Sequence, residues 1–295
     1  MEKKIIILTL TFNRPDNIKE LFFTLQEQTD KDFVWFIVND GSSKDYTTVI
    51  EKIKRDADYE VIYRKKENGG KGDSTNYALD CFSPNDFVVI IDDDEFLYPN
   101  AVEKIRTKMN DYMNSDVGLI NFCRHDTKGK VMATPDIQED FRMSLQEHSK
   151  KKYFSDGYVG YYMKKVGNNR FPIYEGEKYI APGVLMMLVS QHSSILWTPV
   201  VLGCTEYLTG GLTKSGRKLR LNNPRGMATN ALLHLSGDCG FKNRIINSIK
   251  YYAYLEYTKV SDFDIQKYAS TIFAPSMTKI LGKIIAMYWR HKYNK

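Results

Sequence analysis

Residues 87–98 read Phe-Val-Val-Ile-Ile-Asp-Asp-Asp-Glu-Phe-Leu-Tyr, in which five apolar residues are followed directly by four acidic ones. The apolar run is rich in β-branched side chains and predicts a strand buried on both faces of a sheet. The adjacent carboxylates Asp92, Asp93, Asp94 and Glu95 repel one another unless a cation lies among them. Acidic oxygen clusters suit hard divalent ions such as Mg²⁺ or Mn²⁺, which proteins commonly share with a substrate phosphate. The run therefore predicts a metal-assisted site for a phosphate-bearing ligand, and the alternative is an acidic loop that only ends the strand.

Two further polar clusters follow predicted secondary structure. Asp40 ends the second strand, where an aspartate accepts a hydrogen bond from the imide N–H of uracil, or else serves as a turn residue or helix cap. The segment Asn68-Gly69-Gly70-Lys71-Gly72 lacks the Gly-x-x-x-x-Gly-Lys-Ser/Thr spacing of a nucleoside-triphosphatase loop. Its glycines either let the backbone approach a flat base or form a flexible turn. Both clusters are candidates for nucleotide contact.

The elements that position these clusters alternate over the first 125 residues. A helix is expected from Pro15 to about Gln28, with Asn13 as its N-cap. Other helices are expected at 45–55, 74–81 and 99–113, and strands at 5–12, 33–38, 60–64, 87–91 and 117–123. This alternation predicts an α/β fold with a mostly parallel sheet covered by helices on both faces. Ligands bind such sheets at the carboxyl ends of the strands. Three clusters fall at such ends and should converge on one edge, namely Phe12-Asn13, Asn39-Asp40 and Asp92–Asp94.

The remaining sequence has weaker patterns. Residues 124–179 predict loops and short helices that build a second substrate pocket, and helices are expected at 181–191, 226–237 and 243–260. The polar segment 206–225 predicts a mobile loop, in which Lys214, Arg217 and Lys218 either clamp a departing diphosphate or are simply solvated. We expect a nucleotide-binding half at 1–125, an acceptor-binding and catalytic half at 126–240, and a helical extension at 241–295.

Composition narrows the class of protein. The chain has 295 residues and a net charge of +6, and its four cysteines form no Cys-x-x-Cys pair. That spacing argues against a zinc ribbon, a redox motif or a disulfide framework, and it fits a reducing compartment. The apolar run at 5–12 is too short for a signal peptide, and no segment reaches the ~18–20 apolar residues of a membrane span. We expect a cytoplasmic protein or one peripheral to a membrane.

The C-terminal tail, 275–295, predicts a basic amphipathic helix. Apolar residues recur on one face, namely Met277, Ile280, Leu281, Ile284, Ile285 and Tyr288. Lys279, Lys283 and Arg290 lie mostly on the other face. Such a helix suits an anionic membrane surface, and the alternative is a helix packed on the protein or on a partner subunit.

Taken together, the clusters resemble the family-2 glycosyltransferases of the GT-A fold. The resemblance covers roughly residues 4–120, and the later segment 206–213 looks like bacterial capsule and cell-surface polysaccharide members. The matching motifs are Thr11-Phe12-Asn13-Arg14, Gln28-Thr29, Asn39-Asp40-Gly41-Ser42, Asn68-Gly69-Gly70-Lys71-Gly72 with Asn76, and Ile91–Leu97.

The resemblance implies a role for each matching residue. Asp40 would read uracil, Asp92 would bind the ribose or the metal, and Asp94 would ligate the metal that bridges the diphosphate. The nucleotide-binding set would be Thr11, Phe12, Asn13, Arg14, Asp40, Asn68, Gly69, Lys71, Asn76, Asp92 and Asp93. The family's usual base is the Asp of a Glu-Asp pair, and the matching place here reads Gly-Glu-Lys, which makes Glu177 the candidate base and Glu175 the second. Aromatic neighbours would raise the pKa of such a glutamate, although a surface turn explains the segment equally well.

The expected activity is a Mn²⁺- or Mg²⁺-dependent, inverting transfer of a sugar from a UDP-sugar to a saccharide or lipid-linked saccharide in cell-surface polysaccharide synthesis. No nucleic-acid partner is expected, and a homo-oligomer is compatible with the sequence. One alternative is a haloacid-dehalogenase-type phosphatase with Asp92 as nucleophile and Asp94 two residues on. That motif normally lies on the first strand with Thr or Val where Phe96 stands here. Another alternative is a non-catalytic nucleotide-sugar-binding module.

Overall fold

The computed structural model describes residues 4–134, 136–150, 154–155, 157–205, 216–258 and 274–293. The chain divides into two compact units, each assembled from segments that are distant in sequence. The first unit comprises Met1–Met143, Tyr153–Asn169 and His192–Tyr207, and the second comprises Ser144–Lys152, Arg170–Gln191 and Leu208–Lys295.

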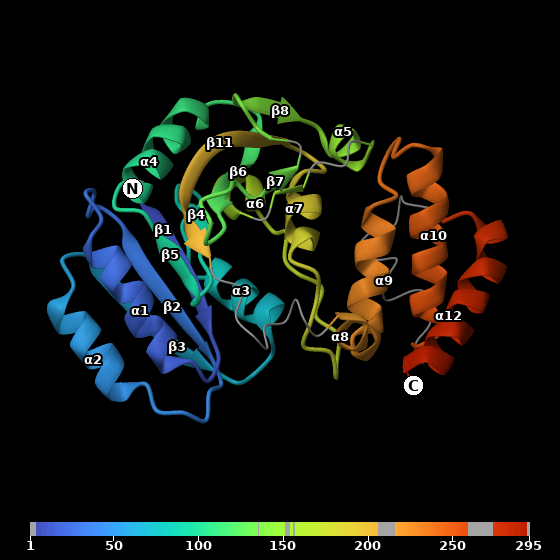
Figure 1. Cartoon of the computed structure of the whole chain (residues 1–295), viewed down its shortest axis with the longest axis horizontal. Helices are drawn as coiled ribbons and strands as arrows, with labels where there is room; N and C mark the ends of the chain where they lie inside the picture. Colours follow the sequence, from blue (N-terminus) through green and yellow to red (C-terminus); the bar gives the residue numbers. More distant parts are fainter. Residues whose placement is uncertain are drawn as a thin grey trace. The chain divides into compact units, whose positions relative to one another are not determined.

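A twisted sheet forms the first unit (Figure 1). Its described strands are β1 (Ile5–Thr11), β2 (Val34–Asp40), β3 (Glu60–Lys66), β4 (Phe87–Ile90), β5 (Glu95–Leu97), β6 (Val117–His125), β8 (Phe141–Met143), β10 (Tyr158–Tyr162) and β11 (Ser194–Thr205). Along the sheet the order is β3-β2-β1-β4-β10-β6-β11-β5, and β8 also pairs with β11. Strands β1 to β4 are parallel to one another, as are β6 and β11. A separate antiparallel pair joins β7 (Ala133–Thr134) and β9 (Phe154–Ser155). The prediction of a mostly parallel sheet is confirmed.

Helices cover both faces of this sheet. One core joins the sheet to α1 (Pro15–Gln26), α2 (Thr47–Asp56) and α4 (Ala101–Tyr112), whose buried side chains belong to one cluster. The α1 contribution recurs at i, i+3, i+4 and i+7, with every member buried, and each large apolar side chain there contributes about 1.5–3 kcal/mol. Helix α3 (Lys71–Leu79) contacts β1 and β2 outside that cluster, and α6 (Met163–Val166) contacts β6 and β10.

Strand register brings the polar strand ends to one level. Leu8 pairs with Ile90, so β1 continues three residues beyond the last pair with β4 and ends at Thr11, which pairs with Asn39 of β2. The residues that follow Ile90 therefore run alongside the end of β1. The predicted convergence at the carboxyl edge is confirmed for the clusters after β1, β2 and β4.

Three local predictions are wrong. Residues 158–162, predicted to lie among loops and short helices, form strand β10, which is antiparallel to both of its neighbours. Residues 216–222 form the helix α8 rather than a loop. Asn13 does not cap α1, because its backbone has a φ of +58° and its side chain bonds to the loop after β2.

The second unit is largely helical. Its described elements are α5 (Leu145–Lys150), α7 (Gly183–Val189), α8 (Gly216–Asn222), α9 (Pro224–Leu233), α10 (Phe241–Leu255), the 3₁₀ turn η2 (Ser276–Thr278) and α12 (Lys279–Tyr293). Helix α9 packs on α7 and α10, and α12 packs on α10. The helices predicted near 181–191, 226–237, 243–260 and in the tail are confirmed with shifted ends. Among the described residues, no helix combines the length and apolar character that crossing a membrane requires.

Candidate functional site

The acidic run after β4 alternates between buried and accessible side chains. Asp93 and Glu95 are buried, whereas the Asp92 and Asp94 side chains are 42% and 26% exposed. Residues 92–95 form a turn, in which the backbone N–H of Glu95 donates to the Asp92 carbonyl at 3.2 Å, and the turn directs neighbouring side chains to different surroundings. The two buried acids must therefore be satisfied by the protein, and the other two can face a ligand.

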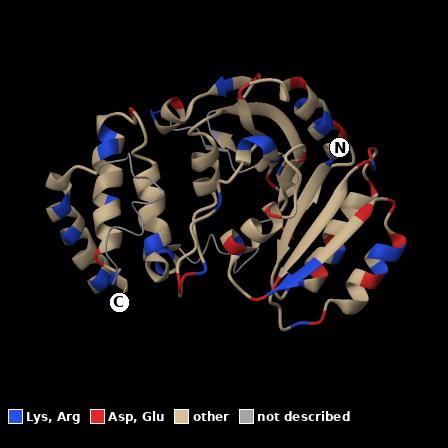
Figure 2. Ribbon diagram, turned by 180° about the vertical axis from the view of Figure 1, so that it is seen from behind, with Lys and Arg blue, Asp and Glu red and all other residues tan. Residues whose placement is uncertain are grey.

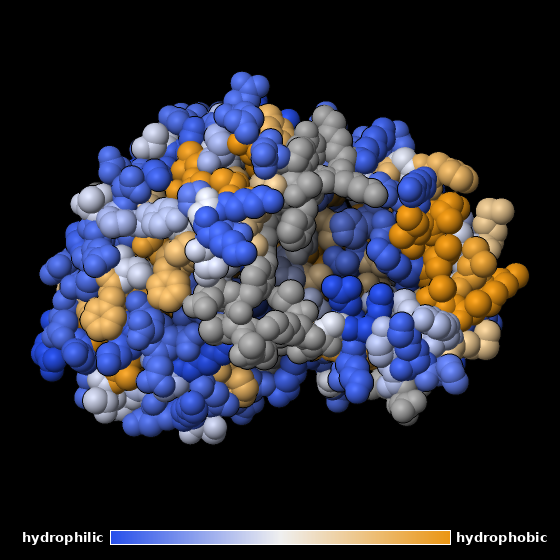
Figure 3. Space-filling model, in the orientation of Figure 1, coloured by the Kyte–Doolittle hydropathy of each residue, from blue (hydrophilic) through white to orange (hydrophobic). Residues whose placement is uncertain are grey.

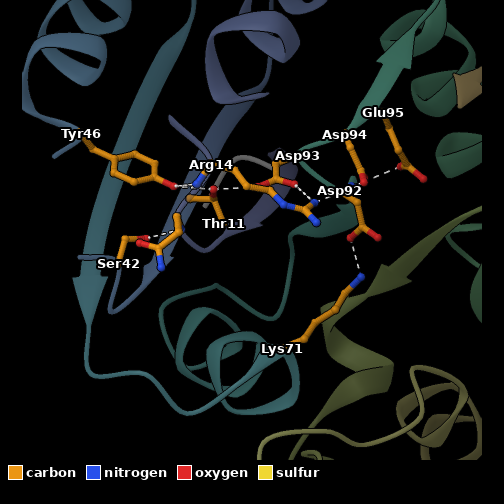
Figure 4. Close-up of polar contacts among 10 residues, drawn as sticks. Thr11, Arg14, Ser42, Tyr46, Lys71, Asp92, Asp93, Asp94 and Glu95 are labelled. Carbon is orange, nitrogen blue, oxygen red and sulfur yellow. Dashed lines mark hydrogen bonds and ion pairs between the residues drawn. The ribbon is translucent and has the colours of Figure 1, made fainter. Parts of the chain in front are cut away.

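Asp93 is tied to the end of β1 (Figure 4). Thr11 Oγ1 donates to Asp93 Oδ2 at 2.7 Å, and Thr11 Oγ1 also lies 2.9 Å from the Tyr46 hydroxyl. The backbone N–H of Arg14 donates to the same Tyr46 hydroxyl at 2.8 Å. Burial raises the pKa of Asp93 to about 6, and the Thr11 hydrogen bond and the Arg14 charge oppose this rise. Tyr46 has no motif around it, so sequence reasoning missed it.

Glu95 has a second structural task. One of its oxygens pairs with Arg124 Nη1, and the other accepts the backbone N–H of Asp92 at 3.2 Å. Burial, followed by the charge of Asp92, raises the pKa of Glu95 to about 8. Glu95 therefore fixes the backbone at Asp92. Sequence reasoning missed Arg124, whose only signal is a basic residue at the end of a buried strand.

Two cations hold the accessible acids. Arg14 Nη1 lies 3.2 Å from Asp93 Oδ1 and 3.3 Å from Asp94 Oδ2, and Lys71 Nζ lies 2.5 Å from Asp92 Oδ1. Burial lowers the pKa of Lys71, but the charge of Asp92 outweighs burial and raises that pKa above the ordinary lysine value. Burial raises the pKa of Asp92, and Lys71 outweighs it, so this pKa lies below its usual range. The pair is therefore ionised at neutral pH, and the site offers both anionic and cationic groups.

Asp40 is buried and anchors the glycine turn that precedes α3. Its Oδ1 accepts the backbone N–H of Gly69 at 2.9 Å, and its Oδ2 accepts that of Gly70 at 2.8 Å and the Asn68 side-chain amide at 3.1 Å. The close approach needs Gly41, which has a φ of +72° and whose Cβ would lie 2.5 Å from the Asn68 backbone nitrogen. The structure thus unites Asp40, Asn68 and Gly69, which the sequence predicted to share a site.

Asn13 joins the ends of β1 and β2. Its side-chain oxygen accepts the backbone N–H groups of Ser43 at 2.9 Å and Lys44 at 3.2 Å, and its own N–H donates to Ser42 Oγ at 2.8 Å. Beside it, Phe12, which directly follows the mostly buried strand β1, is exposed. The first two strand ends therefore form one fixed loop pair that presents an accessible aromatic ring.

A family model described as glycosyl transferase family 2 matches residues 6–167, which is more than half of the chain. The chain belongs to this family. It is 24% identical over 173 residues to GalNAc(5)-diNAcBac-PP-undecaprenol beta-1,3-glucosyltransferase of Campylobacter jejuni, covering 57% of this chain and 54% of that protein. The chain spans about half or less of the length of the first curated relatives that it matches.

Solved structures show the same fold. TarS 1–349 of S. aureus in complex with UDP-GlcNAc has a TM-score of 0.63 at 16% identity and covers 94% of this chain and 83% of that one. Mannosyltransferase PcManGT from Pyrobaculum calidifontis, in complex with GDP-Man and Mn²⁺, has a TM-score of 0.57 at 13% identity and covers 99% and 88%. This family-2 chain has the GT-A fold, as its motifs predicted.

A divalent metal fits the chemistry of the accessible acids. Among the described residues, no group of three or more His, Cys, Asp and Glu side chains could enclose an ion. In that part of the chain, Lys71 bonds to one oxygen of Asp92, and Arg14 bonds to one oxygen of Asp94. The second oxygen of each carboxylate is left for another ligand. Mg²⁺ commonly binds one or two carboxylates and completes its shell with substrate phosphates and water. Asp92 and Asp94 are two accessible carboxylates of the kind that such a site uses.

The predicted base residues lie in the second unit. The Glu177 side chain is 6% exposed, its Oε1 accepts the backbone N–H of Arg225 at 2.8 Å, and its Oε2 accepts that of Gly226 at 2.9 Å. These N–H groups belong to the first turn of α9, so Glu177 also completes a helix N-terminus. Glu175 is exposed, and its carbonyl accepts a hydrogen bond from the Arg225 guanidinium.

The other predicted residues have separate positions. Asn76 lies on α3 of the first unit, and Lys218 is exposed on α8. Arg217 on α8 donates to the Tyr254 hydroxyl at 2.9 Å and lies over the Trp289 ring at 4.4 Å, contacts that attach α8 to α10 and α12. Lys214 lies outside the described residues. The diphosphate role of this group remains a prediction.

Proposed function

We propose that this family-2 chain transfers a sugar, with inversion, from a UDP-sugar to a saccharide acceptor in cell-surface polysaccharide synthesis. The observation that carries the proposal is the alternation of accessible and buried acids after β4. It leaves Asp92 accessible beside Lys71 and Asp94 accessible beside Arg14. Carboxylates that hold a cation, beside basic groups that contact phosphate oxygens, suit a nucleotide diphosphate. The fold shared with TarS in complex with UDP-GlcNAc supports the choice of donor.

The nucleoside would lie along the first two strand ends. Asp40 accepts a hydrogen bond from the uracil imide N–H, the glycine turn gives the base room, and Phe12 offers an exposed ring on this edge. Asn68, Gly69 and Asn76 complete the proposed nucleotide contacts together with Thr11, Asn13 and Asp93. Asp40 Oδ1 already accepts from the Gly69 backbone and the Lys66 ammonium, and Oδ2 accepts from the Gly70 backbone and the Asn68 amide. The uracil imide would therefore replace one of the two side-chain donors.

Asp92 and Asp94 would hold the metal, which the proposal identifies as Mn²⁺ or Mg²⁺. A bound divalent ion would act as a Lewis acid that stabilises the charge growing on the departing diphosphate. Lys71 and Arg14 neutralise the acidic run and orient Asp92 and Asp94. Lys214, Arg217 and Lys218 are the proposed additional cations for the diphosphate.

We propose that Glu177 is the base that removes the acceptor proton, and Glu175 is the second candidate. Glu177→Gln and Glu175→Gln separate the two residues, because loss of a general base lowers the transfer rate by about 10²–10⁴-fold. Thermal unfolding of both variants serves as the control. A Glu177→Gln variant that loses thermal stability but transfers sugar at the wild-type rate assigns Glu177 to the α9 terminus alone and refutes its role as base.

The proposed acceptor is lipid-linked, and the proposed location is peripheral on the cytoplasmic face of the membrane. The name of the Campylobacter jejuni relative gives its acceptor as a saccharide on PP-undecaprenol. Support for this chain comes from that likeness and from the basic C-terminal helix.

The test begins with calorimetric titration of UDP, GDP and dTDP, with and without Mn²⁺. We expect UDP to bind most tightly and only with the metal, and Asp94→Asn to abolish the effect of the metal. A panel of UDP-sugars then identifies the donor by transfer to a synthetic acceptor. Metal-independent UDP binding in both wild type and Asp94→Asn refutes the metal role. Phosphate-ester hydrolysis without any nucleotide indicates a phosphatase instead.

A further inference from the structure

Helix α12 packs on α10 through its small side chains. Gly282 and Ala286 are buried there, and a Cβ at Gly282 would lie 2.5 Å from the Tyr252 Cβ. Trp289 completes this face, with its ring 5.1 Å from that of Tyr254. The glycine and the alanine allow the two helices to approach closely, and this contact fixes which face of α12 points outward.

The outward face carries the large apolar side chains. Figure 3 shows a continuous hydrophobic area over α10 and α12. Its exposed members on η2 and α12 are Met277, Ile280, Leu281, Ile284, Met287 and Tyr288. Ile280 is 70% exposed, and Phe241 and Ile246 of α10 are 83% and 39% exposed. An apolar area of this kind is typical of an interaction site rather than of a solvated helix.

The charge on the two helices has a single sign. Within the described helices, α10 contains Lys and Arg at three positions, α12 contains them at four, and neither contains Asp or Glu. Figure 2 shows these basic residues spread along both helices. At 100° per residue, Lys279, Lys283 and Arg290 border one side of the apolar face, and Lys292 borders the other. The apolar face is therefore flanked by cations on both sides.

We propose that the exposed face of α10 and α12 docks on an anionic lipid surface. Apolar side chains with basic flanks complement the acyl boundary and the negative head groups of such a membrane. A second copy of the chain is the poorer occupant, because symmetric pairing would bring two surfaces of the same charge together. The surface would present the enzyme to a lipid-linked acceptor, a purpose that rests on the proposed function.

The test is flotation of the full chain with phosphatidylcholine vesicles and with vesicles that also contain phosphatidylglycerol. We expect binding only to the anionic vesicles, and weaker binding at high salt. Ile280→Ser together with Ile284→Ser should weaken binding about 30-fold or more, because several inserted carbons are lost. The matched control is Phe23→Ser, which alters an exposed apolar residue of α1 and should leave binding unchanged.

Charge is tested separately from apolar contact. Lys279→Gln with Lys283→Gln should weaken binding about 25-fold, at about fivefold for each charge. Lys52→Gln with Lys54→Gln, on the exposed side of α2, has the same net charge and should bind like wild type. Equal weakening by both pairs would show that only net charge matters, and it would overturn the assignment of this surface.

Two further outcomes also overturn the proposal. One is equal binding to neutral and anionic vesicles. The other is a wild-type dimer in sedimentation that the Ile280 and Ile284 substitutions convert to monomer, with no vesicle binding, since the face would then belong to a second copy. UDP titration is run on every variant. Intact UDP binding with lost flotation isolates the lipid surface, and the converse result points to the nucleotide site.

Discussion

Replacing Thr11 by valine removes one hydroxyl at the centre of the site and nearly preserves the side-chain shape. Thr11 is 2% exposed, and its Oγ1 donates to the buried Asp93 carboxylate at 2.7 Å. A hydrogen bond to a charged group contributes about 1.5–3 kcal/mol, and a buried acceptor left without its donor carries a further desolvation cost. We therefore expect Thr11→Val to lower the free energy of unfolding by about 2–3 kcal/mol. Because Asp93 also bonds to Arg14, we expect weaker binding of UDP with Mn²⁺, by at least about threefold.

Strand β1 supplies a matched control two residues earlier. Thr9 is also fully buried, and its Oγ1 accepts the indole N–H of Trp35 at 3.0 Å. This bond joins neutral groups, so Thr9→Val should cost about 1 kcal/mol of stability. In the described part of the chain its partner is Trp35 rather than the acidic run, and UDP binding should be unchanged.

Urea unfolding at pH 7 measures both stabilities, and calorimetric titration of UDP with saturating Mn²⁺ measures binding. Of the two variants, we expect Thr11→Val to be the more destabilised and to be the one that binds UDP more weakly than the wild type. Two variants of equal stability that both bind UDP like wild type would refute the claim that Thr11 holds the acidic run in its binding geometry.

Three more predictions each concern a single residue. Gly41→Ala should lower the free energy of unfolding by at least about 2 kcal/mol and weaken UDP binding, because the added Cβ would lie 2.5 Å from the Asn68 backbone nitrogen. The control is Gly129→Ala, at a similar φ of +77° but with open space around it, which should lower the free energy of unfolding by only about 1 kcal/mol. Urea unfolding measures both. Lys71→Met should raise the KM for the UDP-sugar about tenfold or more in transfer assays, whereas Lys65→Met, at an exposed position of β3, should not. Burial lowers the pKa of His234 to about 4, whereas the unfolded chain has the ordinary histidine pKa near 6.5. Between these two values only the unfolded chain binds the proton. The free energy of unfolding should therefore decrease as the pH is lowered from about 6.5 to 4, by up to ~1.4 kcal/mol per pH unit. His234→Gln should reduce that slope in urea midpoints measured across the range, and an unchanged slope would contradict it.

The sequence predicted the strands whose pattern is local. β1, β2 and β4 are predominantly apolar runs that lead into polar residues, and such runs identify buried strands of a parallel sheet. β10 has no such signal, because its sequence, Tyr-Val-Gly-Tyr-Tyr, is short and lacks clear alternation. Its glycine is required by a neighbour, since a Cβ at Gly160 would lie 2.5 Å from the Phe87 ring. A requirement set by a side chain on another strand cannot be found within one segment.

In the candidate site, too, the features with a local sequence pattern were predictable, and the contacts between distant residues were not. The acids were predictable because four of them stand together after an apolar run. Their partners were not assigned, because Arg14 precedes Asp93 by 79 residues and Arg124 follows Glu95 by 29. Lys71 was proposed as a nucleotide contact, and its pairing with Asp92 appears only when α3 is placed beneath the end of β4.

The order of the four acids explains how the chain tolerates them together. In the turn that follows β4, Asp93 is directed toward Thr11 and Arg14, and Glu95 is directed toward Arg124. The buried pair thereby holds the backbone, and the accessible pair, Asp92 and Asp94, is left one residue apart on the ligand side. A shift of one residue would take Asp93 and Glu95 away from the partners that satisfy their buried charges. The spacing of the run is therefore as essential to the proposed metal site as its charge, and an inserted glycine after Ile91 should abolish metal-dependent UDP binding even though every carboxylate remains.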